Sequence, residues 1–514
     1  MSYIKLLHNF LENSNDLFPD KQALYHNNIW YTYKEINDRS NQLAHYLLSL
    51  GLKKGDRLAL LLENSFEYVV SYYAILKIGA ITVALNTENT REDINFILDD
   101  CGVNLVITNQ KYLKKVKERY EHGKLLNHIL VWSKQDLKGF ENKEKRLSLL
   151  PRDIDSFSSK NPSINVIDLD VASIVYTSGS TGKPRGATLT HLNIITNTHS
   201  IVKYLDLSSN DRIMVVLPFY YIYGKSLLNT HFFVGGSVVI DNRFLYPNVV
   251  LNTMMEQMVT GFSGVPSTFT ILLHRSNIRS HKFDHLRYVT QAGGAMAPAI
   301  QKEVAKVFHP AKFFIMYGAT EASARLSYLD PNDLPRKWGS IGKAIPNVEL
   351  FIADDKGHPL RQGEQGEIVA RGANIMRGYW NHPEETRKVL RNGLYYTGDV
   401  GVMDDDGFLF VIGRNKDMIK IGGNRVSAKE IEEVLYEHPD VADAAVIGIY
   451  DEILGEAIKA FIVPKNGNLI QDRNDLIMHF LKSKLAPYKL PKYLEFRDTL
   501  PKNKSGKVLK MNLK

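Results

Sequence analysis

The spacing of apolar residues changes repeatedly along the first hundred positions. Over residues 33–50, apolar side chains recur every three or four positions, which predicts a helix with one buried face that ends at Gly51. The continuous apolar run at 57–62 predicts a buried strand. The alternation continues with a predicted helix at 67–78 and predicted strands at 80–85 and 104–108. This order predicts an α/β fold with mainly parallel sheets covered by helices.

The pattern is weaker in the next part of the chain and then returns. Residues 111–159 are charged and less regular, so we expect a surface excursion there. Further strands are predicted at 212–217, 237–241, 286–290 and 313–316. Small or polar residues follow three strands, at 177–182, 293–295 and 317–321. Ligands in open α/β sheets bind beyond the carboxyl ends of strands, so these stretches predict one shared crevice.

The pattern of apolar and polar residues changes again after residue 348. Short apolar runs are separated by turn signals such as Asp-Asp-Gly and Asn-Gly, which predict a small antiparallel module. A boundary is expected near 413–417. Beyond it, predicted helices at 428–436 and 475–485 and strands at 444–449 and 457–463 form a small α+β unit.

Length and composition limit the class of protein. A chain of 514 residues is too long for one ordinary core, and 44% hydrophobic residues suit a globular protein. No apolar run reaches the ~18–20 residues of a membrane span, and no signal peptide is visible in residues 1–20. Cys101 is the single cysteine and is interpreted as structural. We therefore expect a cytoplasmic protein.

The net charge of +8 is concentrated at one end of the chain. Residues 482–514 contain ten Lys or Arg and two acids, which accounts for the whole excess. Two interpretations are open: a solvated basic tail, or a segment that meets a phosphate-rich small molecule. A nucleic-acid partner is not expected, because the rest of the chain is balanced in charge.

Residues 176–186, Tyr-Thr-Ser-Gly-Ser-Thr-Gly-Lys-Pro-Arg-Gly, are the most distinctive stretch. They follow a predicted buried strand and precede a helical pattern beginning near residue 192, so we expect a loop between a strand and a helix. Glycines, hydroxyl side chains and two cations make a polyphosphate cradle, although the spacing is not that of the common P-loop. A flexible Gly/Ser loop is the alternative.

Six motifs in order resemble those of the AMP-forming adenylate enzymes, which include acyl-CoA synthetases, peptide-synthetase adenylation domains and beetle luciferase. The chain is most similar to an acyl-CoA synthetase. The motifs extend over nearly the whole chain, at 54–57 (Lys-Gly-Asp-Arg), 176–186, 317–321 (Tyr-Gly-Ala-Thr-Glu), 396–399 (Tyr-Thr-Gly-Asp), 413–423 and 501–507. The resemblance implies a large N-terminal domain at 1–413, a hinge at 414–416 and a small mobile α+β domain at 417–514.

The family activates a carboxylic acid with ATP and Mg²⁺ as an acyl-adenylate, then transfers the acyl group to coenzyme A or to the phosphopantetheine of a carrier protein. The resemblance implies that Glu321 holds the metal, Thr320 the α-phosphate and Asp399 the ribose hydroxyls. Arg414 would reach the ribose or the phosphates, and Tyr317 would stack on adenine. The remaining nucleotide contacts implied are Thr177, Ser178, Gly179, Ser180, Thr181, Gly182, Lys183, Gly293, Gly294, Ala295 and Gly318.

Three lysines carry the two half-reactions in this resemblance. Lys507 would bridge the substrate carboxylate and the α-phosphate during adenylation. Lys416 would be the hinge about which the C-terminal domain rotates, bringing Lys420 toward the site for thioester formation. From the residues alone, Thr320 is equally an N-cap, Asp399 a turn residue and Lys507 one lysine among many.

The acid is expected to bind among Tyr221, Ile222, Lys225, Gly264, Gly293 and Ala322. This sequence departs from the family here, because residues 217–224 contain neither the histidine of many acyl-CoA synthetases nor the aspartate common in amino-acid-activating members. We therefore expect an acid without an α-amino group. Lys225 is expected either to point to solvent or to meet a second carboxylate on the substrate.

Three classes of function are compatible with these observations in principle. They are an acid–thiol ligase, a nucleotide-binding protein without turnover and a nucleic-acid-binding protein. A protein without turnover predicts the loss of a chemical residue, yet Lys507 and Glu321 are both present. The sequence therefore favours the ligase, with coenzyme A or a separate carrier protein as the acceptor.

Overall fold

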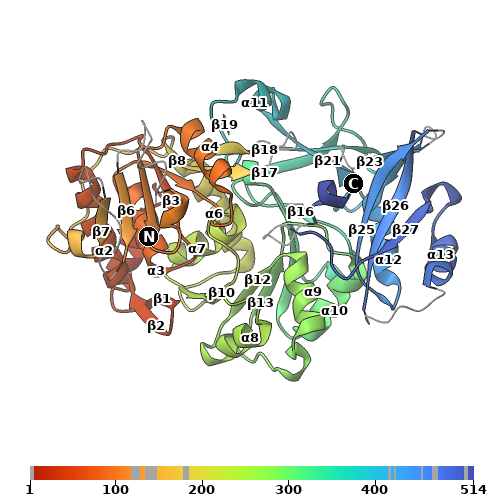
Figure 1. The fold of residues 1–514 in the computed structure, drawn as a ribbon, viewed down its shortest axis with the longest axis horizontal. Coiled ribbons are helices and arrows are strands. Elements are labelled where there is room, and N and C mark those ends of the chain that lie inside the picture. The colour runs from red at the N-terminus through yellow and green to blue at the C-terminus, as the bar shows by residue number, and fades with distance from the viewer. Residues whose placement is uncertain are drawn as a thin grey trace.

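A computed structural model describes residues 5–116, 128–133, 147–177, 184–414, 418–421, 424–452, 455–465, 473–502 and 508–513. Within these residues the chain forms four sheets, with the C-terminal part at one end of the molecule (Figure 1). Two large sheets are mostly parallel, a third is antiparallel and the fourth belongs to the C-terminal domain. The predicted fold class is confirmed.

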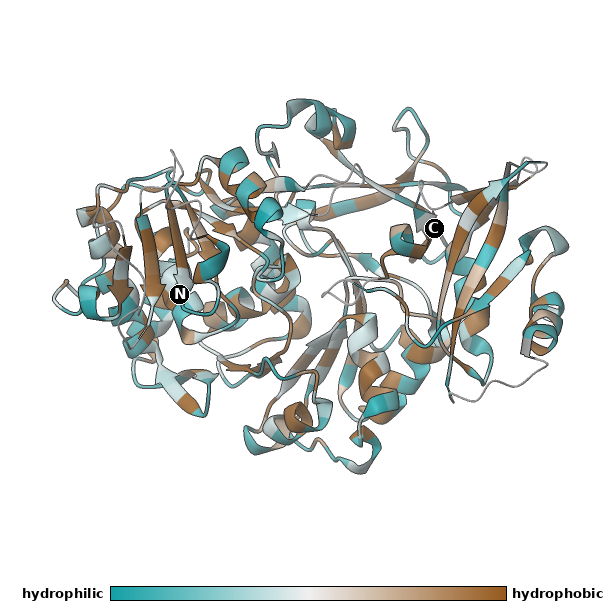
Figure 2. Ribbon diagram, in the orientation of Figure 1, coloured by the Kyte–Doolittle hydropathy of each residue, from teal (hydrophilic) through white to brown (hydrophobic). Residues whose placement is uncertain are grey.

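The first large sheet has eight strands within the described residues, and those from β8 to β7 run parallel. Its order is β19 (Gly378–Tyr379), β9 (Arg185–Thr190), β8 (Val171–Thr177), β4 (Ile81–Ala84), β3 (Arg57–Leu61), β5 (Leu105–Asn109), β6 (His128–Trp132) and β7 (Leu147–Leu150). Figure 2 shows its central strands as strongly apolar. The helices that follow its strands are α3 (Phe66–Lys77) and α4 (Arg91–Cys101), and α2 (Tyr33–Ser49) lies against α3.

Two expectations about this sheet are wrong. The stretch 111–159 is not only a surface excursion, because β6 and β7 extend the sheet; their short apolar runs are hidden in a charged context. The loop after β8 does not lead directly into a helix either. β9 intervenes and pairs antiparallel with β8, and α6 (His191–Leu205) begins only after it, at a capping box formed by Thr190 and Asn193.

The second large sheet has nine strands among the described residues, and its central strands run parallel. Its order is β16 (Lys343–Ala344), β15 (Ser327–Leu329), β14 (Lys312–Tyr317), β13 (Tyr288–Gln291), β12 (Gly261–Gly264), β10 (Arg212–Val215), β11 (Ser237–Ile240), β1 (Gln22–His26) and β2 (Ile29–Thr32). Its helices are α7 (Ile222–Val234), α8 (Pro247–Glu256), α9 (Pro266–Arg275) and α10 (Pro298–Val307), and α1 (Asn9–Leu17) packs on α7.

One hydrophobic core joins the two large sheets. It contains buried residues of α3 such as Tyr72 and Leu76 together with buried residues of α7 such as Leu228 and Phe232. Inward-facing strand residues from both sheets, Leu60 among them, belong to the same core. The helices between the sheets therefore bury apolar surface on both sides, which fixes the sheets relative to each other.

The antiparallel module consists of β17 (Val348–Ala353), β18 (Gln365–Gly372), β20 (Leu390–Arg391), β21 (Leu394–Met403) and β22 (Leu409–Arg414), with α11 (Pro383–Val389) beside it. It was predicted from the turn signals. Its register places Asp399 on β21 directly opposite Arg414 at the end of β22. Two residues that are 15 positions apart thus become neighbours in this sheet.

The C-terminal domain contains β23 (Met418–Ile421), β24 (Asn424–Ser427), β25 (Val441–Asp451), β26 (Gly455–Pro464) and β27 (Tyr493–Phe496), with α12 (Ala428–Glu437) and α13 (Arg473–Lys484). The first residues of this domain contact the antiparallel module. The Ser427 hydroxyl donates a hydrogen bond to the carbonyl of Ile412, and the Lys429 ammonium donates one to the carbonyl of Val411. In addition, α12 lies beside α10 (Figure 1).

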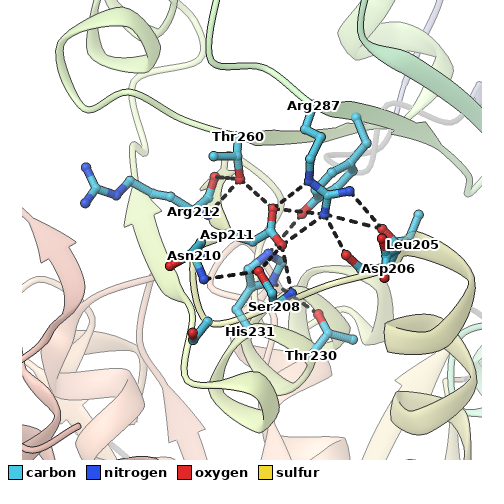
Figure 3. Close-up of polar contacts among 12 residues, drawn as sticks. Leu205, Asp206, Ser208, Asn210, Asp211, Arg212, Thr230, His231, Thr260 and Arg287 are labelled. Carbon is cyan, nitrogen blue, oxygen red and sulfur yellow. Dashed lines mark hydrogen bonds and ion pairs between the residues drawn. The ribbon is translucent and has the colours of Figure 1, made fainter.

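A buried carboxylate ties together the amino ends of three neighbouring strands (Figure 3). Asp211, which precedes β10, accepts hydrogen bonds from the Arg287 guanidinium at 2.9 Å and the Thr260 hydroxyl at 2.9 Å. Thr260 precedes β12 and Arg287 precedes β13, and Arg287 also donates to the carbonyl of Leu205 at the end of α6. This network holds together the amino ends of these strands, at the opposite end of the sheet from their carboxyl ends.

Beside this network, a buried histidine makes stability depend on pH. His231 contacts the Tyr288 hydroxyl through Nε2 and the Leu227 carbonyl through Nδ1, both at 2.9 Å. Burial lowers the pKa of His231 to about 4, against about 6.5 for an exposed histidine. Below pH 6.5 the unfolded chain therefore binds a proton that the folded chain does not. The stabilisation is complete above pH 6.5 and is lost as the pH falls toward 4.

We expect this histidine alone to cost about 1.4 kcal/mol of unfolding free energy between pH 7.5 and 5.5. The check is chemical denaturation at both pH values for the wild type, His231→Asn and a control, His285→Asn, at an exposed position. His231→Asn should show a smaller loss on acidification than the wild type, and the control should not. An unchanged loss in His231→Asn would contradict the assignment. His8 and His191, whose pKa values burial lowers to about 4 and about 3, add to the total.

Candidate active site

A cavity of about 630 Å³ lies where three of the sheets meet. One wall is the turn between β10 and α7 together with the ends of β12 and β13. A second wall is the segment that follows β14, and a third comes from the antiparallel module with Asp399 and Arg414. Thr177 at the end of β8 and Arg185 at the start of β9 line it as well. The predicted crevice beyond the strand ends is therefore present as a cavity.

The carboxylate of Asp399 is held from two sides. It accepts a hydrogen bond from the Tyr317 hydroxyl at 2.5 Å and another from Arg414 Nε at 2.8 Å. Asp399 is buried within β21 and is not the turn residue that its motif alone suggested, and its negative charge raises the pKa of Arg414. Tyr317, expected from the resemblance to stack on adenine, has its hydroxyl engaged with Asp399. This arrangement orients a fixed anion at the cavity wall, which suits the binding of vicinal hydroxyls.

Glu321 is positioned by the short helix η4 (Thr320–Ala322), which follows β14. Its Oε1 accepts a hydrogen bond from the Tyr379 hydroxyl at 2.7 Å. Thr320 is the first residue of η4 and not its cap, because the N-cap position is Ala319. Gly318 is required just before it, since a Cβ there would lie 1.9 Å from the carbonyl oxygen of Ala324. Thr320 and Glu321 both line the cavity.

The residues fit a magnesium ion that is bound together with phosphate. No group of three or more possible metal ligands occurs among the residues the structure describes. Mg²⁺ in nucleotide sites usually takes one or two carboxylates and completes its shell with phosphate oxygens and water. A single carboxylate at Glu321, already oriented by Tyr379, meets that requirement.

The end of the cavity assigned to the acid is lined by Tyr221, Ile222, Tyr223, Val265 and Gly293. Gly224, near the start of α7, permits the close approach of this helix to the preceding loop, because a Cβ would lie 2.2 Å from the carbonyl oxygen of Pro218. Of the other residues expected in this pocket, Gly264 and Ala322 are buried behind the wall. Gly294 and Ala295 are exposed beside Gly293.

Lys225 does not point to solvent, contrary to one of the two expectations. It is 3% exposed, and its ammonium lies 4.9 Å from the ring centre of Tyr68 and 4.4 Å from that of Tyr72. Nζ has no hydrogen-bond partner in the described part of the chain, and burial lowers the pKa of Lys225 to about 7. The side chain therefore enters the space between α7 and α3, outside the cavity lining.

Several predicted residues lie outside those that the structure describes: Ser178, Gly179, Ser180, Thr181, Gly182, Lys183, Lys416 and Lys507, and the side chain of Lys420. The cavity also contains residues that sequence reasoning did not identify. Arg325, Glu367, Tyr379 and Tyr396 line it, and Arg185 pairs with Glu385 at 2.6 Å on its wall. The available signal was membership of the motif at 396–399 for Tyr396 and closeness to the motif at 317–321 for Arg325.

The cavity combines the start of the predicted phosphate loop with two oriented carboxylates, Asp399 and Glu321, an arrangement that suits a nucleotide. The comparisons with known proteins specify the class. The model of the AMP-binding enzyme family matches residues 11–380, and that of the AMP-binding enzyme C-terminal domain matches residues 430–507. The chain belongs to the AMP-binding enzyme family.

The similar proteins are named as ligases or synthetases, and the similarity extends over nearly their full length. The chain is 32% identical to the long-chain-fatty-acid–CoA ligase of Bacillus subtilis, covering 99% of this chain and 94% of that one. The anthranilate CoA ligase AuaEII, solved with anthranoyl-AMP, superposes with a TM-score of 0.91 at 28% identity, covering 99% and 96%. The o-succinylbenzoate CoA synthetase of Bacillus subtilis, solved with ATP and magnesium, gives 0.83 at 29% identity, covering 98% and 99%. The protein is an AMP-forming acid–thiol ligase.

Two further findings bear on earlier expectations. Among the described residues, no helix is both long enough and apolar enough to cross a membrane. Cys101 is buried against the Tyr176 hydroxyl at 3.2 Å, and burial raises the pKa of its thiol to about 12. A thiol that stays protonated is a poor nucleophile, which agrees with its structural interpretation.

Proposed function

We propose that the protein activates a carboxylic acid without an α-amino group and transfers it to the thiol of coenzyme A. The carrying observation is that Thr320, Glu321, Asp399 and Arg414 line one cavity together with Tyr221 and Ile222. One end thus offers anchors for a nucleotide, and the other offers an apolar and aromatic surface for an acid. The coenzyme A ligases among the relatives support this acceptor over the phosphopantetheine of a carrier protein.

In the first half-reaction, a carboxylate oxygen of the acid attacks the α-phosphorus of ATP. The new bond is O–P, the bond to the bridging oxygen breaks, and pyrophosphate leaves with the electron pair. Asp399 accepts hydrogen bonds from the ribose hydroxyls, and Tyr317 and Arg414 keep it oriented. Thr320 donates to the α-phosphate. Glu321 would hold Mg²⁺, which when bound would supply positive charge beside the phosphate oxygens.

In the second half-reaction, the thiol sulfur of coenzyme A forms a C–S bond to the acyl carbon and gives its proton to solvent. The bond from that carbon to the phosphate oxygen breaks, and AMP leaves with the electron pair. We assign the charge-neutralising role of the first step to Lys507 and the pivot between the steps to Lys416. Residues 1–413 would then form one body, 414–416 the hinge and 417–514 the moving domain. The family's two half-reactions and the position of Arg414 at the end of β22 support this division.

The segment at the acid end of the pocket has no carboxylate side chain that could pair with a substrate ammonium group, which supports an acid without an α-amino group as the substrate. Residues 217–227 contain no Asp or Glu, and the pocket end has a cation, Arg325, in its wall. An α-ammonium group placed there would be buried unpaired, which costs several kcal/mol. An apolar or aromatic acid loses little by entering among Tyr221, Ile222 and Tyr223.

The test is ATP–pyrophosphate exchange over a panel of straight-chain acids, aryl acids, dicarboxylic acids and the common amino acids. We expect every amino acid to give a lower kcat/KM than the best acid that lacks an α-amino group. AMP formation with that acid should then rise when coenzyme A is added. If an amino acid gives the highest kcat/KM, the pocket assignment fails. If coenzyme A changes nothing and a phosphopantetheinylated carrier accepts the acyl group, the acceptor is the carrier.

A further inference from the structure

A buried arginine lines the acid end of the cavity and has no acidic partner among the described residues. Arg325 is 2% exposed and belongs to the cavity wall together with Tyr223 and Gly224. Its guanidinium carbon lies 4.2 Å from the ring centre of Tyr223. Its hydrogen bonds go to weak or neutral acceptors: Nε donates to the sulfur of Met316 at 3.3 Å, and Nη1 donates to the carbonyl of Ala324 at 3.0 Å.

Two other arginines of the cavity wall, and one at the amino ends of the strands, are paired with carboxylates, whereas Arg391, which also lines the cavity, is exposed and lies over the ring of Tyr396. Arg185 pairs with Glu385, Arg414 with Asp399, and Arg287 with Asp211. A guanidinium keeps its charge at any physiological pH, so the charge of Arg325 stays in a site largely removed from water. Burying an unpaired charge is costly, and an anion in the cavity would reduce that cost.

The backbone of Arg325 is held in place by hydrogen bonds. Its carbonyl oxygen accepts hydrogen bonds from the side-chain amides of Asn197 and Asn374, both at 2.9 Å. The ring of Tyr223 is held in turn, because its hydroxyl contacts the Thr290 hydroxyl at 2.9 Å. Backbone and ring together restrict the place that the guanidinium can occupy. Such preorganisation suits recognition of one anionic group more than general charge balance.

The reacting carboxylate and the phosphates have other partners in the proposed function, which leaves this cation for another part of the substrate. We propose that Arg325 binds a second carboxylate on the acid, so that the preferred substrate is a dicarboxylic acid with an apolar or aromatic spacer. The inference rests on the proposed function and specifies its substrate class. A planar guanidinium can meet a carboxylate with two parallel hydrogen bonds, which a monocarboxylic acid cannot offer at that end.

The experiment compares matched pairs of acids by ATP–pyrophosphate exchange: butyrate with succinate, hexanoate with adipate, and benzoate with isophthalate. For at least one pair, the wild type should have a higher kcat/KM for the diacid. Arg325→Met should lower the ratio of kcat/KM, diacid over monoacid, by about 10- to 100-fold, the effect of losing a charge-assisted hydrogen bond. Arg325→Lys should restore part of the ratio, because lysine keeps the positive charge but cannot donate the two parallel hydrogen bonds of a guanidinium.

The matched control is Lys225→Met, which removes a buried cation that also belongs to this region but lies outside the cavity lining. It should keep the wild-type ratio. A ratio is independent of how much of each variant is folded. A wild type that prefers the monoacid in every pair overturns the inference, and so does an Arg325→Met variant that loses activity equally with both members of a pair. If no acid supports exchange in the wild type, the proposed function itself fails and the inference with it.

Discussion

Replacing Lys507 by alanine is expected to slow acyl-adenylate formation by ~10²–10³-fold, the cost of losing one donor that acts in the transition state. Negative charge builds up between the attacking carboxylate and the α-phosphate as pyrophosphate leaves. A lysine in that position neutralises the charge only in this step. Thioester formation from supplied acyl-adenylate and coenzyme A should therefore proceed at the wild-type rate.

Single-turnover measurements of the two half-reactions separate these effects. Lys502→Ala is the matched control, because Lys502 belongs to the same basic segment but forms an ion pair with Asp443 within its own domain at 2.5 Å. That variant should retain both half-reactions. Equal losses in adenylation and transfer for Lys507→Ala would show that the lysine supports the domain generally and that the assigned role is wrong.

Lys416→Pro is expected to give the opposite result, with adenylation retained and transfer abolished. A hinge must change its backbone angles, and proline fixes φ near about −65°. The structure shows what a rotation has to break: the hydrogen bonds from Ser427 and Lys429 to carbonyl groups of β22. A chain that cannot change its angles at the junction cannot exchange these contacts for others.

The same single-turnover assays test this prediction, with Lys416→Ala as the control that removes the side chain and leaves the backbone free. The control should complete both half-reactions. Transfer at the wild-type rate in Lys416→Pro would remove residue 416 from the hinge. A proline variant that fails in both steps would indicate a general disturbance of the domain junction.

The sequence pattern predicted those elements whose apolar positions follow local burial, either on one face of a helix or along a fully buried strand. The helix expected at 33–50 is α2, and the strand expected at 57–62 is β3, with only small differences at their ends. β1 was not predicted, although it pairs with the adjacent β2 across the turn at Asn27 and Asn28. Its pairing with β11, with Leu24 opposite Val238, joins segments far apart in the sequence and leaves no local signal. β6 and β9 were missed because charged or polar neighbours interrupt their short apolar runs.

The site shows the same division between local and distant information. Glu321 follows the end of β14 as expected, and Asp399 lines the same cavity although it lies within a strand. The burial of Lys225 was not foreseeable, since it depends on Tyr68 and Tyr72, which belong to a helix far earlier in the chain. The contact between Tyr317 and Asp399 likewise joins two sheets. The spacing of residues along the chain carries no information about contacts between elements that are distant in sequence.

The division of the cavity between sheets has a consequence for how this protein and its relatives diverge. The acid end is built on the nine-stranded sheet, whereas Asp399 and Arg414 stand on the antiparallel one. Substitutions at the first location could exchange one acid for another without displacing the proposed anchors of the nucleotide. Relatives that are 32%, 28% and 29% identical carry names for a fatty acid, anthranilate and o-succinylbenzoate. These names differ in the acid, which is the difference that a separate sheet for the acid end would allow.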